Sequence, residues 1–586
     1  MRLVAAVLAP ILFMAILEGG LRLFGYGFPT GFLVKTDDGR EYRVNDKFAR
    51  QFYPGSTSVK SNPFRMPAVK DPETIRIFVL GESAALGTPN PAYSFSRILE
   101  TMLRSRYPRQ RFEVFNAAMR GINSHVILEI ARDCSAHQPD LFIVYMGNNE
   151  VAGLHAPRPK SSLLSQNLTF IRCLQRIRST RSGQLLTALL QKPSRAEQDM
   201  DFFRAHRLAA DDRRRRAVCD NFRANLEEMC DVMTASGAKV ILSTVPVNLR
   251  DFPPLASLHR ADLSASEQAD WERFYRAGIT AETATGLEEA ITQYEAAARI
   301  DDQFADLQFR LAQCHLGLGR WEEALKRCVL ACDRDALAFR ADSPLNEIIR
   351  TVAAQRDARG VTLIDMERTF AESDLSDHRV PGDRLFSDHV HLKFAGDYLV
   401  AQSLYPVVAA LLGQRLGPAA APPLPSRQQC AEWLAYTDWD ELQTRTAMVK
   451  LTSLPPFLDQ IDHVQRQSQA ERELKERSAR FSRQELQKSI ALYHVALERT
   501  PEDWQLHHNF GMLCYLTHDY LTAAQNLAVE VQRFPDLLPG RLALGAALAS
   551  AGKTQEARDQ FEEVLRINPG NRQAKQAIAA LGSVRR

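Results

Sequence analysis

The stretch Ile75-Arg76-Ile77-Phe78-Val79-Leu80-Gly81-Glu82-Ser83 decides the fold. Its first six residues are mostly β-branched or apolar, which predicts a buried strand. Gly81 and Ser83 then form a turn, and residues 95–104 have the pattern of a helix. This order places the Ser83 hydroxyl at the carboxyl end of a strand, where open α/β sheets carry their sites. A serine beside a glycine is more often an ordinary turn residue, so this stretch alone does not indicate catalysis.

Further strands with the same apolar character follow along the chain, and helix-like segments separate most of them. They cover residues 112–116, 141–146, 239–244 and 361–365. Continuous apolar strands that alternate with helices are typical of a parallel sheet covered on both faces. The sequence therefore predicts an α/β fold.

Polar residues come after several of these strands. They are the block Asn116 to Gly121, the block Gly147-Asn148-Asn149-Glu150, and the block Asp388-His389-Val390-His391 with Gly396 downstream. Each block is a weak signal alone. Together with Gly81-Glu82-Ser83 they make four blocks in a fixed order on the expected elements, which is a strong signal.

In these blocks the chain resembles the SGNH (GDSL-like) serine hydrolase family, over about residues 70–270 and 340–413. The resemblance implies a flavodoxin-like parallel sheet with helices on both faces, and esterase activity. It also implies a nucleophile at Ser83, an oxyanion hole of Ser83, Gly121 and Asn149, and a final Asp-x-x-His block at Asp388 and His391. Glu82 and Glu150 differ from the family's usual residues, but neither position is catalytic.

The chemistry needs these residue types. A serine hydroxyl becomes a good nucleophile when an imidazole accepts its proton, here that of His391, and Asp388 can hold the other ring nitrogen. His389 is a rival base that lacks an aspartate three residues before it. His389 and His391 could form half of a metal site, but no further ligands stand at a suitable spacing. We therefore expect neither a metal nor another cofactor.

Two parts of the chain repeat at an interval of 34 residues; small residues recur in both parts, and prolines recur only towards the C-terminus, since Asp302 and Ala336 stand near those places in the middle part. Towards the C-terminus the repeated sets are Ser489, Ala523 and Ala557; Gly511 and Gly545; and Pro501, Pro535 and Pro569. In the middle, Leu287 to Ala290 recurs as Trp321 to Ala324, and Gly278 as Ala312. Small residues let paired helices approach closely, and prolines end them. The pattern resembles the tetratricopeptide (TPR) family and implies protein partners; generic helical hairpins are the alternative.

The N-terminus predicts a membrane anchor. Residues 3–17 carry no charge, and the apolar character continues to residue 28 apart from Glu18 and Arg22, so the stretch is long enough to cross a bilayer. A cleaved signal peptide and a buried core helix are the alternatives, but no good cleavage site follows Leu17. We expect a single-pass anchor and an extracytoplasmic body. The charges just after the segment, Lys35, Arg40, Arg43 and Lys47, favour the opposite orientation.

Composition excludes several classes of protein. Lys+Arg minus Asp+Glu is 73 − 70 = +3 over 586 residues, so we expect no nucleic-acid partner, and no charge excess indicates wholesale binding to an anionic membrane. Nine cysteines without a C-x-x-C pattern indicate neither a disulfide framework nor a zinc ribbon. Residues 213–216 form a run of four arginines, for which a solvated helix start is the expected role and an anion site the alternative.

The predicted domains are an anchor (1–28), a hydrolase domain in two parts (29–270 and 339–413), a TPR insert between them (271–338), a Pro-rich linker with a helical segment (414–470), and C-terminal TPR repeats (471–586). The predicted function is a membrane-anchored serine hydrolase that cleaves an O-acyl ester. The alternatives are an O-acyltransferase that uses the same triad on a glycan, with an acylated glycan as one candidate substrate, and a TPR scaffold that carries an inactive hydrolase fold.

Overall fold

The computed structural model describes residues 2–54, 59, 61–157, 163–190, 200–284, 286–420 and 423–583. The chain divides into two compact units, residues 1–422 with 447–471, and residues 423–446 with 472–586. Residues 447–470, which the sequence groups with the linker, thus belong to the first unit. Two residues of the predicted linker, Ala421 and Pro422, lie outside the described residues.

A five-stranded parallel sheet forms the centre of the first unit, in the order β5-β4-β6-β7-β8. Numbered along the chain, this order is 2-1-3-4-5, the flavodoxin-like arrangement. The predicted α/β fold is therefore confirmed. The strands are β4 (Thr74–Gly81), β5 (Arg111–Asn116), β6 (Leu141–Tyr145), β7 (Lys239–Ser243) and β8 (Val361–Ile364).

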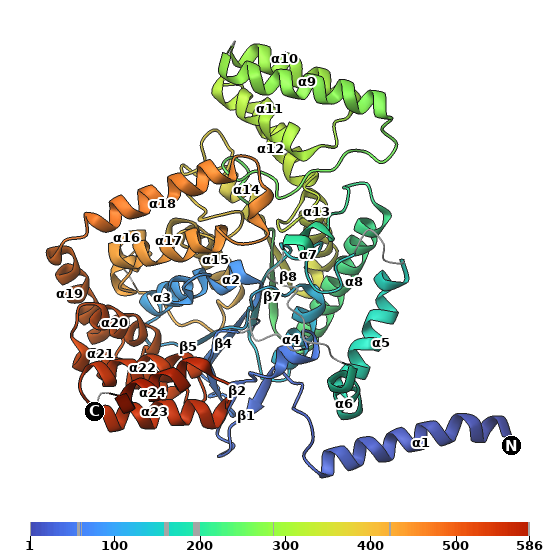
Figure 1. Ribbon diagram of the computed structural model, residues 1–586. Coiled ribbons are helices and arrows are strands. Elements are labelled where there is room, and N and C mark those ends of the chain that lie inside the picture. Colours follow the sequence, from blue (N-terminus) through green and yellow to red (C-terminus); the bar gives the residue numbers. More distant parts are fainter. Residues whose placement is uncertain are drawn as a thin grey trace. The chain divides into compact units, whose positions relative to one another are not determined.

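Helices cover both faces of this sheet (Figure 1). On one face α3 (Phe95–Arg106) packs against α15 (Phe394–Leu411). The other face carries α4 (Ser124–Ser135), α8 (Arg213–Ala235) and α13 (Ser343–Arg356). All eight residues of β4 are buried, as expected of a central strand covered on both sides.

One described helix, α15, is long and apolar enough to cross a membrane. Its inner residues, which include Val400, Ala401 and Leu404, are fully buried, and it packs on α3. This packing makes α15 a core helix of the α/β domain. It does not bear on the predicted N-terminal anchor.

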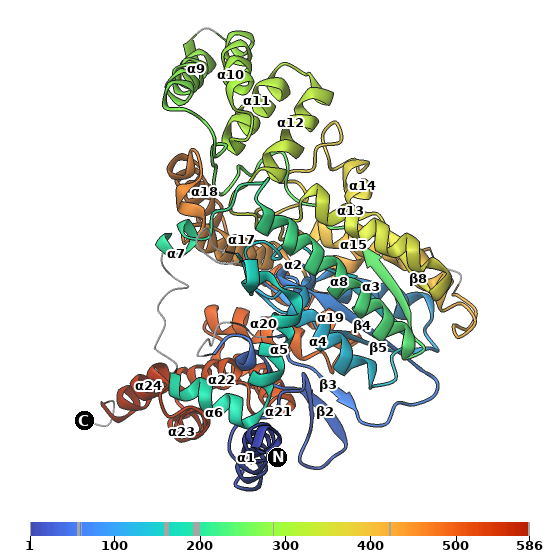
Figure 2. The ribbon, with the colours of Figure 1, turned by 90° about the vertical axis from the view of Figure 1, so that its right-hand side faces the viewer.

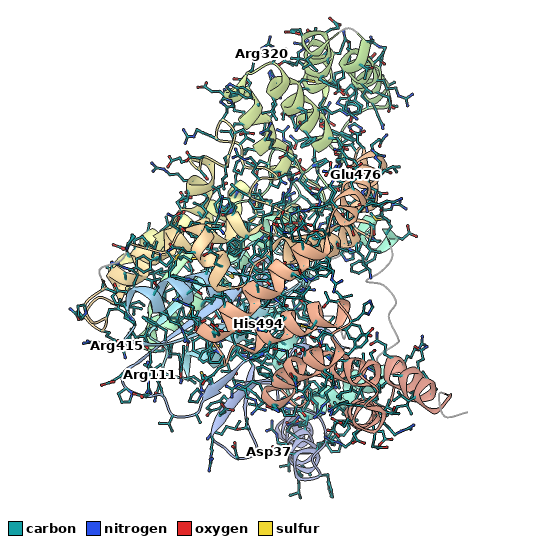
Figure 3. All side chains as sticks on the ribbon, turned by 90° about the vertical axis from the view of Figure 1, so that its left-hand side faces the viewer. Asp37, Arg111, Arg320, Arg415, Glu476 and His494 are labelled. Carbon is teal, nitrogen blue, oxygen red and sulfur yellow. The ribbon has the colours of Figure 1, made fainter. Side chains whose placement is uncertain are left out.

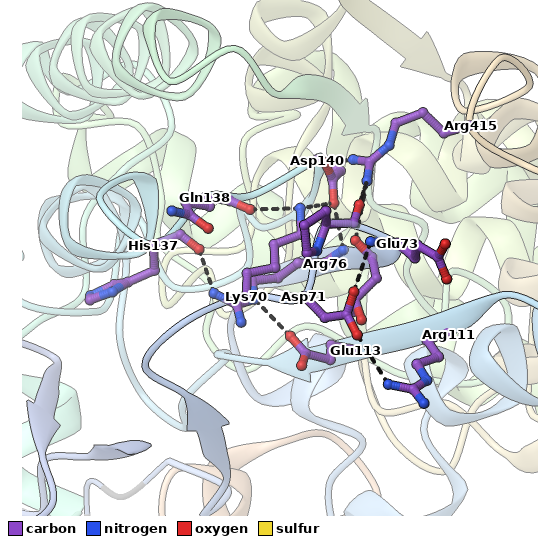
Figure 4. A network of polar contacts seen from close by, with 12 residues as sticks. Lys70, Asp71, Glu73, Arg76, Arg111, Glu113, His137, Gln138, Asp140 and Arg415 are labelled. Atoms are coloured by element: carbon purple, nitrogen blue, oxygen red, sulfur yellow. Dashed lines mark hydrogen bonds and ion pairs between the residues drawn. The ribbon is translucent and has the colours of Figure 1, made fainter. Parts of the chain in front are cut away.

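The amino ends of the strands are closed by a network of ion pairs around Asp140 (Figure 4). The Asp140 carboxylate accepts the backbone N–H of Arg76 at 2.7 Å and pairs with Lys70 and Arg415. The buried Arg76 side chain pairs with Glu113 at 2.7 Å. Figure 3 shows Arg415 at this edge of the domain. The network holds the end of the sheet opposite to the one where Ser83 lies.

The first unit also has elements outside the sheet. Its N-terminal helix is α1 (Arg2–Leu23). Three short antiparallel strands follow, β1 (Leu33–Lys35), β2 (Glu41–Val44) and β3 (Arg65–Pro67). We did not predict them, because strands of three or four residues show no periodicity. Further helices of the unit are α5 (Leu168–Ser179), α6 (Arg181–Leu190), α7 (Met200–Arg204) and α14 (Met366–Ala371).

The insert between β7 and β8 consists of two antiparallel helix pairs (Figure 2). They are α9 (Ala265–Ala284) with α10 (Leu287–Ile300), and α11 (Ala305–Gly317) with α12 (Trp321–Asp333). Gly278 lies against the Tyr294 ring, where a Cβ would come within 2.3 Å of the nearest ring carbon. The small residue at this repeated position is therefore required by the close approach of α9 and α10.

The second unit is helical and contains the C-terminal repeats. Its elements are α16 (Arg427–Trp433), the first part of α17 (Asp438–Thr452), the end of α18 (His463–Ala479), α19 (Arg483–Arg499), α20 (Trp504–Leu516), α21 (Tyr520–Arg533), α22 (Leu538–Ser550), α23 (Thr554–Ile567) and α24 (Arg572–Ser583). A Cβ at Gly511 would lie 2.8 Å from Leu527, and one at Gly545 would lie 2.6 Å from Phe561. The 34-residue spacing of these glycines thus marks equivalent helix contacts.

A buried ion pair fixes the end of the insert to the α/β domain. Arg215 of α8 donates to the Asp342 carboxylate at 2.9 Å and to the Asp335 carbonyl at 3.0 Å. Both side chains of the pair are at least 95% buried. The prediction that residues 213–216 are solvated was therefore wrong for Arg215. The predicted helix start is correct, since α8 begins at Arg213 with Asp212 as its N-cap.

We predict that Arg215→Met lowers the free energy of unfolding by about 3–5 kcal/mol, because it leaves the Asp342 charge buried without its partner. The matched control is Arg216→Met, since Arg216 is exposed in the same arginine run. Urea denaturation followed by circular dichroism measures both changes. Equal denaturation midpoints for the two variants would contradict the assignment.

Candidate active site

The turn after β4 presents Ser83 at the carboxyl end of the strand. Gly81 has room for no side chain, because a Cβ there would lie 2.2 Å from the Tyr145 carbonyl oxygen of β6. Ser83 begins a single helical turn, α2 (Ser83–Leu86), which ends at Gly87 with a φ of +86°. A glycine suits this left-handed position, since other residues would be strained there. The backbone itself therefore fixes the place of the Ser83 hydroxyl.

Ser83, His391 and Asp388 form a continuous line of hydrogen bonds. The Nε2 atom of His391 lies 2.9 Å from the Ser83 Oγ atom. Its Nδ1 atom lies 2.7 Å from Oδ2 of Asp388. With the carboxylate ionised, Nδ1 carries the proton and Nε2 is free to accept the proton of the hydroxyl. The structure thus brings together the three residues that the sequence selected.

The Asp388 carboxylate is held by its own loop. Its Oδ1 atom accepts the backbone N–H groups of Val390 and His391, both at 2.9 Å. Burial alone would raise the pKa of Asp388, but the neighbouring His389 and His391 hold it well below its usual range. Asp388 is therefore ionised at neutral pH and can orient the His391 ring.

The oxyanion candidates follow the two strands beside β4. Gly121, after β5, has a φ of +67°, which favours glycine. Asn149, after β6, is buried, and its side-chain amide donates to the Ile122 carbonyl at 3.0 Å. Ser83, Gly121 and Asn149 thus come from the carboxyl ends of three adjacent strands. Backbone bonds tie these turns together, including that from the Met119 N–H to the Gly81 carbonyl at 3.2 Å.

Two buried glutamates support the turn that carries Asn149. Glu82 accepts the backbone N–H of Asn148 at 2.8 Å and that of Asn149 at 3.3 Å. Glu150 accepts the N–H and the hydroxyl of Ser124 at 2.7 and 2.8 Å. Burial raises the pKa of Glu150 to about 7, and burial together with the nearby Glu150 raises the pKa of Glu82. Sequence reasoning noted both residues only as departures from a family pattern and missed this role.

His389 lies next to the triad but does not share its bonds. Its Nδ1 atom is 3.2 Å from Oδ2 of Asp388, yet it is not aligned for a hydrogen bond. Its ring packs against the rings of Phe252 and Phe457, at centroid distances of 5.3 and 5.6 Å. His389 therefore faces an apolar contact, whereas His391 faces the serine.

Asp388, His389 and His391 also form a cluster whose ligand atoms lie within 4.8 Å of one another, close enough to hold a metal ion. The Asp388 and His391 atoms of this cluster already bond to each other and to Ser83. A metal ion at this place would therefore compete with the triad for the same atoms.

The loop after β7 connects the loop that carries Asp388, His389 and His391 to the insert. Asn248 donates its side-chain amide to the Asp388 carbonyl at 3.0 Å, and its backbone N–H to the His389 carbonyl at 2.9 Å. Arg340, just after the insert, donates to the carbonyls of Asn248 and Phe252, both at 3.0 Å. The return of the chain from the insert therefore supports the Asp-x-x-His loop.

The segment 447–471 adds a further wall beside this loop. Phe457 is buried against Phe252 and His389, and the Gln460 amide donates to the Pro253 carbonyl at 2.7 Å. Asp459 pairs with Arg204 at 2.8 Å. Nothing in the local sequence pattern shows these contacts, because all of them join residues more than 60 positions apart.

We predict that Phe457→Ala destabilises the first unit by about 3–5 kcal/mol, since it removes a buried ring from this wall. Leu458→Ala is the matched control, because Leu458 is the next residue and is 42% exposed. The denaturation midpoints of the two variants give the comparison. If Phe457→Ala unfolded at the wild-type midpoint, the packing of residues 447–471 against His389 would be refuted.

No known protein-family profile and no curated protein matches the chain. Among solved structures it is similar to the lipase/acylhydrolase from Enterococcus faecalis, with 11% identity and a TM-score of 0.25 over 59% of this chain and 100% of that chain. It is similar to TesA, with 11% identity and a TM-score of 0.24 over 57% and 99% of the two chains. The second TPR domain of human RPAP3, solved with an HSP70 peptide, has 22% identity and a TM-score of 0.16 over 17% and 82%. The chain thus resembles lipase/acylhydrolases and TPR domains, but with TM-scores this low the case for its function rests on its own geometry.

Proposed function

We propose that this chain is a membrane-anchored serine hydrolase that cleaves an O-acyl ester and binds proteins through its TPR segments. The observation that carries the proposal is the line of hydrogen bonds from Asp388 through His391 to Ser83. A buried carboxylate, a correctly oriented imidazole and a hydroxyl at a strand end are the parts of a nucleophilic triad. The two nitrogen atoms of His391 lie 2.7 Å from the Asp388 carboxylate and 2.9 Å from the Ser83 hydroxyl, so the three side chains need not move before the reaction.

In the proposed mechanism the Ser83 oxygen attacks the ester carbonyl carbon while Nε2 of His391 takes the hydroxyl proton. The carbonyl oxygen becomes an oxyanion, which accepts hydrogen bonds from the Ser83 and Gly121 N–H groups and the Asn149 amide. Collapse of this intermediate expels the alcohol, which takes the proton from His391 and leaves an acyl group on Ser83. Water then attacks the acyl group by the same steps and releases the acid.

Acyl transfer is the second candidate function. It differs only in the last step, where a sugar hydroxyl attacks in place of water. The burial of His391 and Asp388 favours it, because transfer needs shelter from water. Product analysis with and without a glycan acceptor separates the two functions.

The anchor is supported by α1, a single helix of 22 residues. At 1.5 Å per residue it is about 33 Å long, enough to cross the hydrocarbon core of a bilayer. Of its described side chains, Leu12, Phe13 and Ile16 are more than 60% exposed, as expected of residues that face lipid.

We predict that Ser83→Ala and His391→Ala each abolish nearly all turnover of p-nitrophenyl acetate. The double variant should be little worse than either, because the two residues act as one unit. His389→Ala is the control at the neighbouring histidine, and it should lose much less activity than His391→Ala. A Ser83→Ala protein with wild-type turnover would overturn the triad.

We predict that Asn149→Ala reduces the rate about 10²–10³-fold, the typical cost of one oxyanion donor. Its triad remains intact, so a fluorophosphonate probe should still label Ser83, although slowly. Labelling kinetics and mass mapping of the labelled peptide measure both properties. Labelling of Asn149→Ala at the wild-type rate would exclude Asn149 from the oxyanion hole.

A further inference from the structure

The segment that carries α5 and α6 has an unusual charge. Residues 151–196 contain eight Lys or Arg residues and no Asp or Glu, a net charge of +8, whereas the whole chain carries only +3. The basic residues are Arg158, Lys160, Arg172, Arg176, Arg178, Arg181, Lys192 and Arg195. A local excess of this size attracts an anionic surface, although the chain as a whole is almost neutral.

Both helices of this segment also expose apolar side chains on one face. On α5 the exposed residues are Phe170, Cys173 and Ile177, which the spacing i, i+3, i+7 places on one side of the helix. On α6 they are Leu186, Leu189 and Leu190, with exposed fractions of 53%, 75% and 72%. Basic residues combined with an exposed apolar stripe are typical of a helix that lies in a membrane interface.

The end of α1 is bonded directly to α6. The Glu18 carboxylate accepts the backbone N–H groups of Arg181 and Ser182 at 3.0 and 2.9 Å, and the Ser182 hydroxyl at 2.9 Å. The Gln184 side chain accepts the N–H of Phe28 at 2.9 Å and donates to its carbonyl at 3.1 Å. Figures 1 and 2 show α6 beside the C-terminal end of α1.

These bonds determine the height of α6 relative to a bilayer that α1 crosses. Residues 3–17 carry no charge, and Glu18 is the first charged residue after them; because a carboxylate is costly inside hydrocarbon, Glu18 marks the end of the span at the interface. The headgroup layer on each side of the hydrocarbon core is about 5–8 Å thick. The start of α6, which is hydrogen-bonded to Glu18, therefore lies in this layer, and its exposed leucines have lipid within reach.

We propose that α5 and α6 form a second membrane contact, an anionic-lipid-binding surface that lies in the interface beside the anchor. The apolar stripes of the two helices enter the acyl boundary, and Arg176 and Arg178 of α5 contact lipid phosphates. Arg172 does not take part, because it pairs with Glu228 at 2.7 Å. The surface would hold the α/β domain against the bilayer, whereas α1 alone would only tether it. The proposal rests on the proposed anchor.

A fluorophore on one native cysteine can report the contact of α5 with lipid. All nine cysteines lie in the described part of the chain, and Cys173, on the proposed lipid face of α5, is the one that is exposed. The full-length protein is labelled there with an environment-sensitive fluorophore and reconstituted into vesicles of phosphatidylcholine and phosphatidylglycerol. A nitroxide on the acyl chains, near the headgroups, serves as the quencher. The matched control is C173S/E289C, which moves the label to an exposed site on α10 of the insert.

We expect a blue-shifted emission and strong quenching for the label at Cys173, and neither for the label at position 289. The double substitution L186E/L189E should reduce the quenching at Cys173, because it places two carboxylates in the lipid contact. Flotation of the vesicles separates the two proposals. If the protein floats but the label at Cys173 is quenched no more than the label at position 289, the anchor stands and the lipid surface is refuted. The same result is expected if a protein, and not lipid, covers this face. If the protein does not float, both are refuted.

Discussion

The hydrogen bond between His391 and Ser83 is the interaction on which the account depends. It joins two residues that are 308 positions apart in the chain. Everything between them, including four strands and an inserted pair of helical hairpins, must fold so that residue 391 returns to the carboxyl end of β4. The sheet and the loops at its carboxyl end hold the His391 Nε2 atom 2.9 Å from the Ser83 Oγ atom.

The insert is the longest excursion in this path, since the chain leaves the sheet after β7 and returns to it only at β8. The chain secures both ends with buried charges. Arg215 holds Asp342, and Arg340 holds the loop carbonyls of Asn248 and Phe252. A charge is costly to bury unless it is paired, and Arg215 pairs with Asp342 whereas Arg340 pairs with Asp335 at 3.4 Å. Because Asn248 in turn bonds to the Asp388 and His389 carbonyls, the insert and the Asp-x-x-His loop share one network.

Much of the fold could be predicted from the sequence, because it depends on local patterns. The five strands of the parallel sheet show as apolar runs, and the repeats show as small residues at an interval of 34, such as Gly511 and Gly545. The triad could be selected because its residues stand in short blocks. The burial of Arg215, the bonds of Glu82 and the packing of Phe457 on His389 could not, since each depends on a partner far along the chain. The charge of residues 151–196 is visible in the sequence but disappears when it is averaged over the whole chain.

The most direct test of the central claim is a crystal structure of the protein after reaction with a fluorophosphonate, which mimics the tetrahedral intermediate. The account predicts a covalent bond from phosphorus to the Ser83 Oγ atom. It also predicts that the phosphoryl oxygen accepts hydrogen bonds from the Gly121 N–H and the Asn149 amide, with Nε2 of His391 beside the ester oxygen. An adduct on another residue, or a phosphoryl oxygen that points away from Asn149, would contradict it.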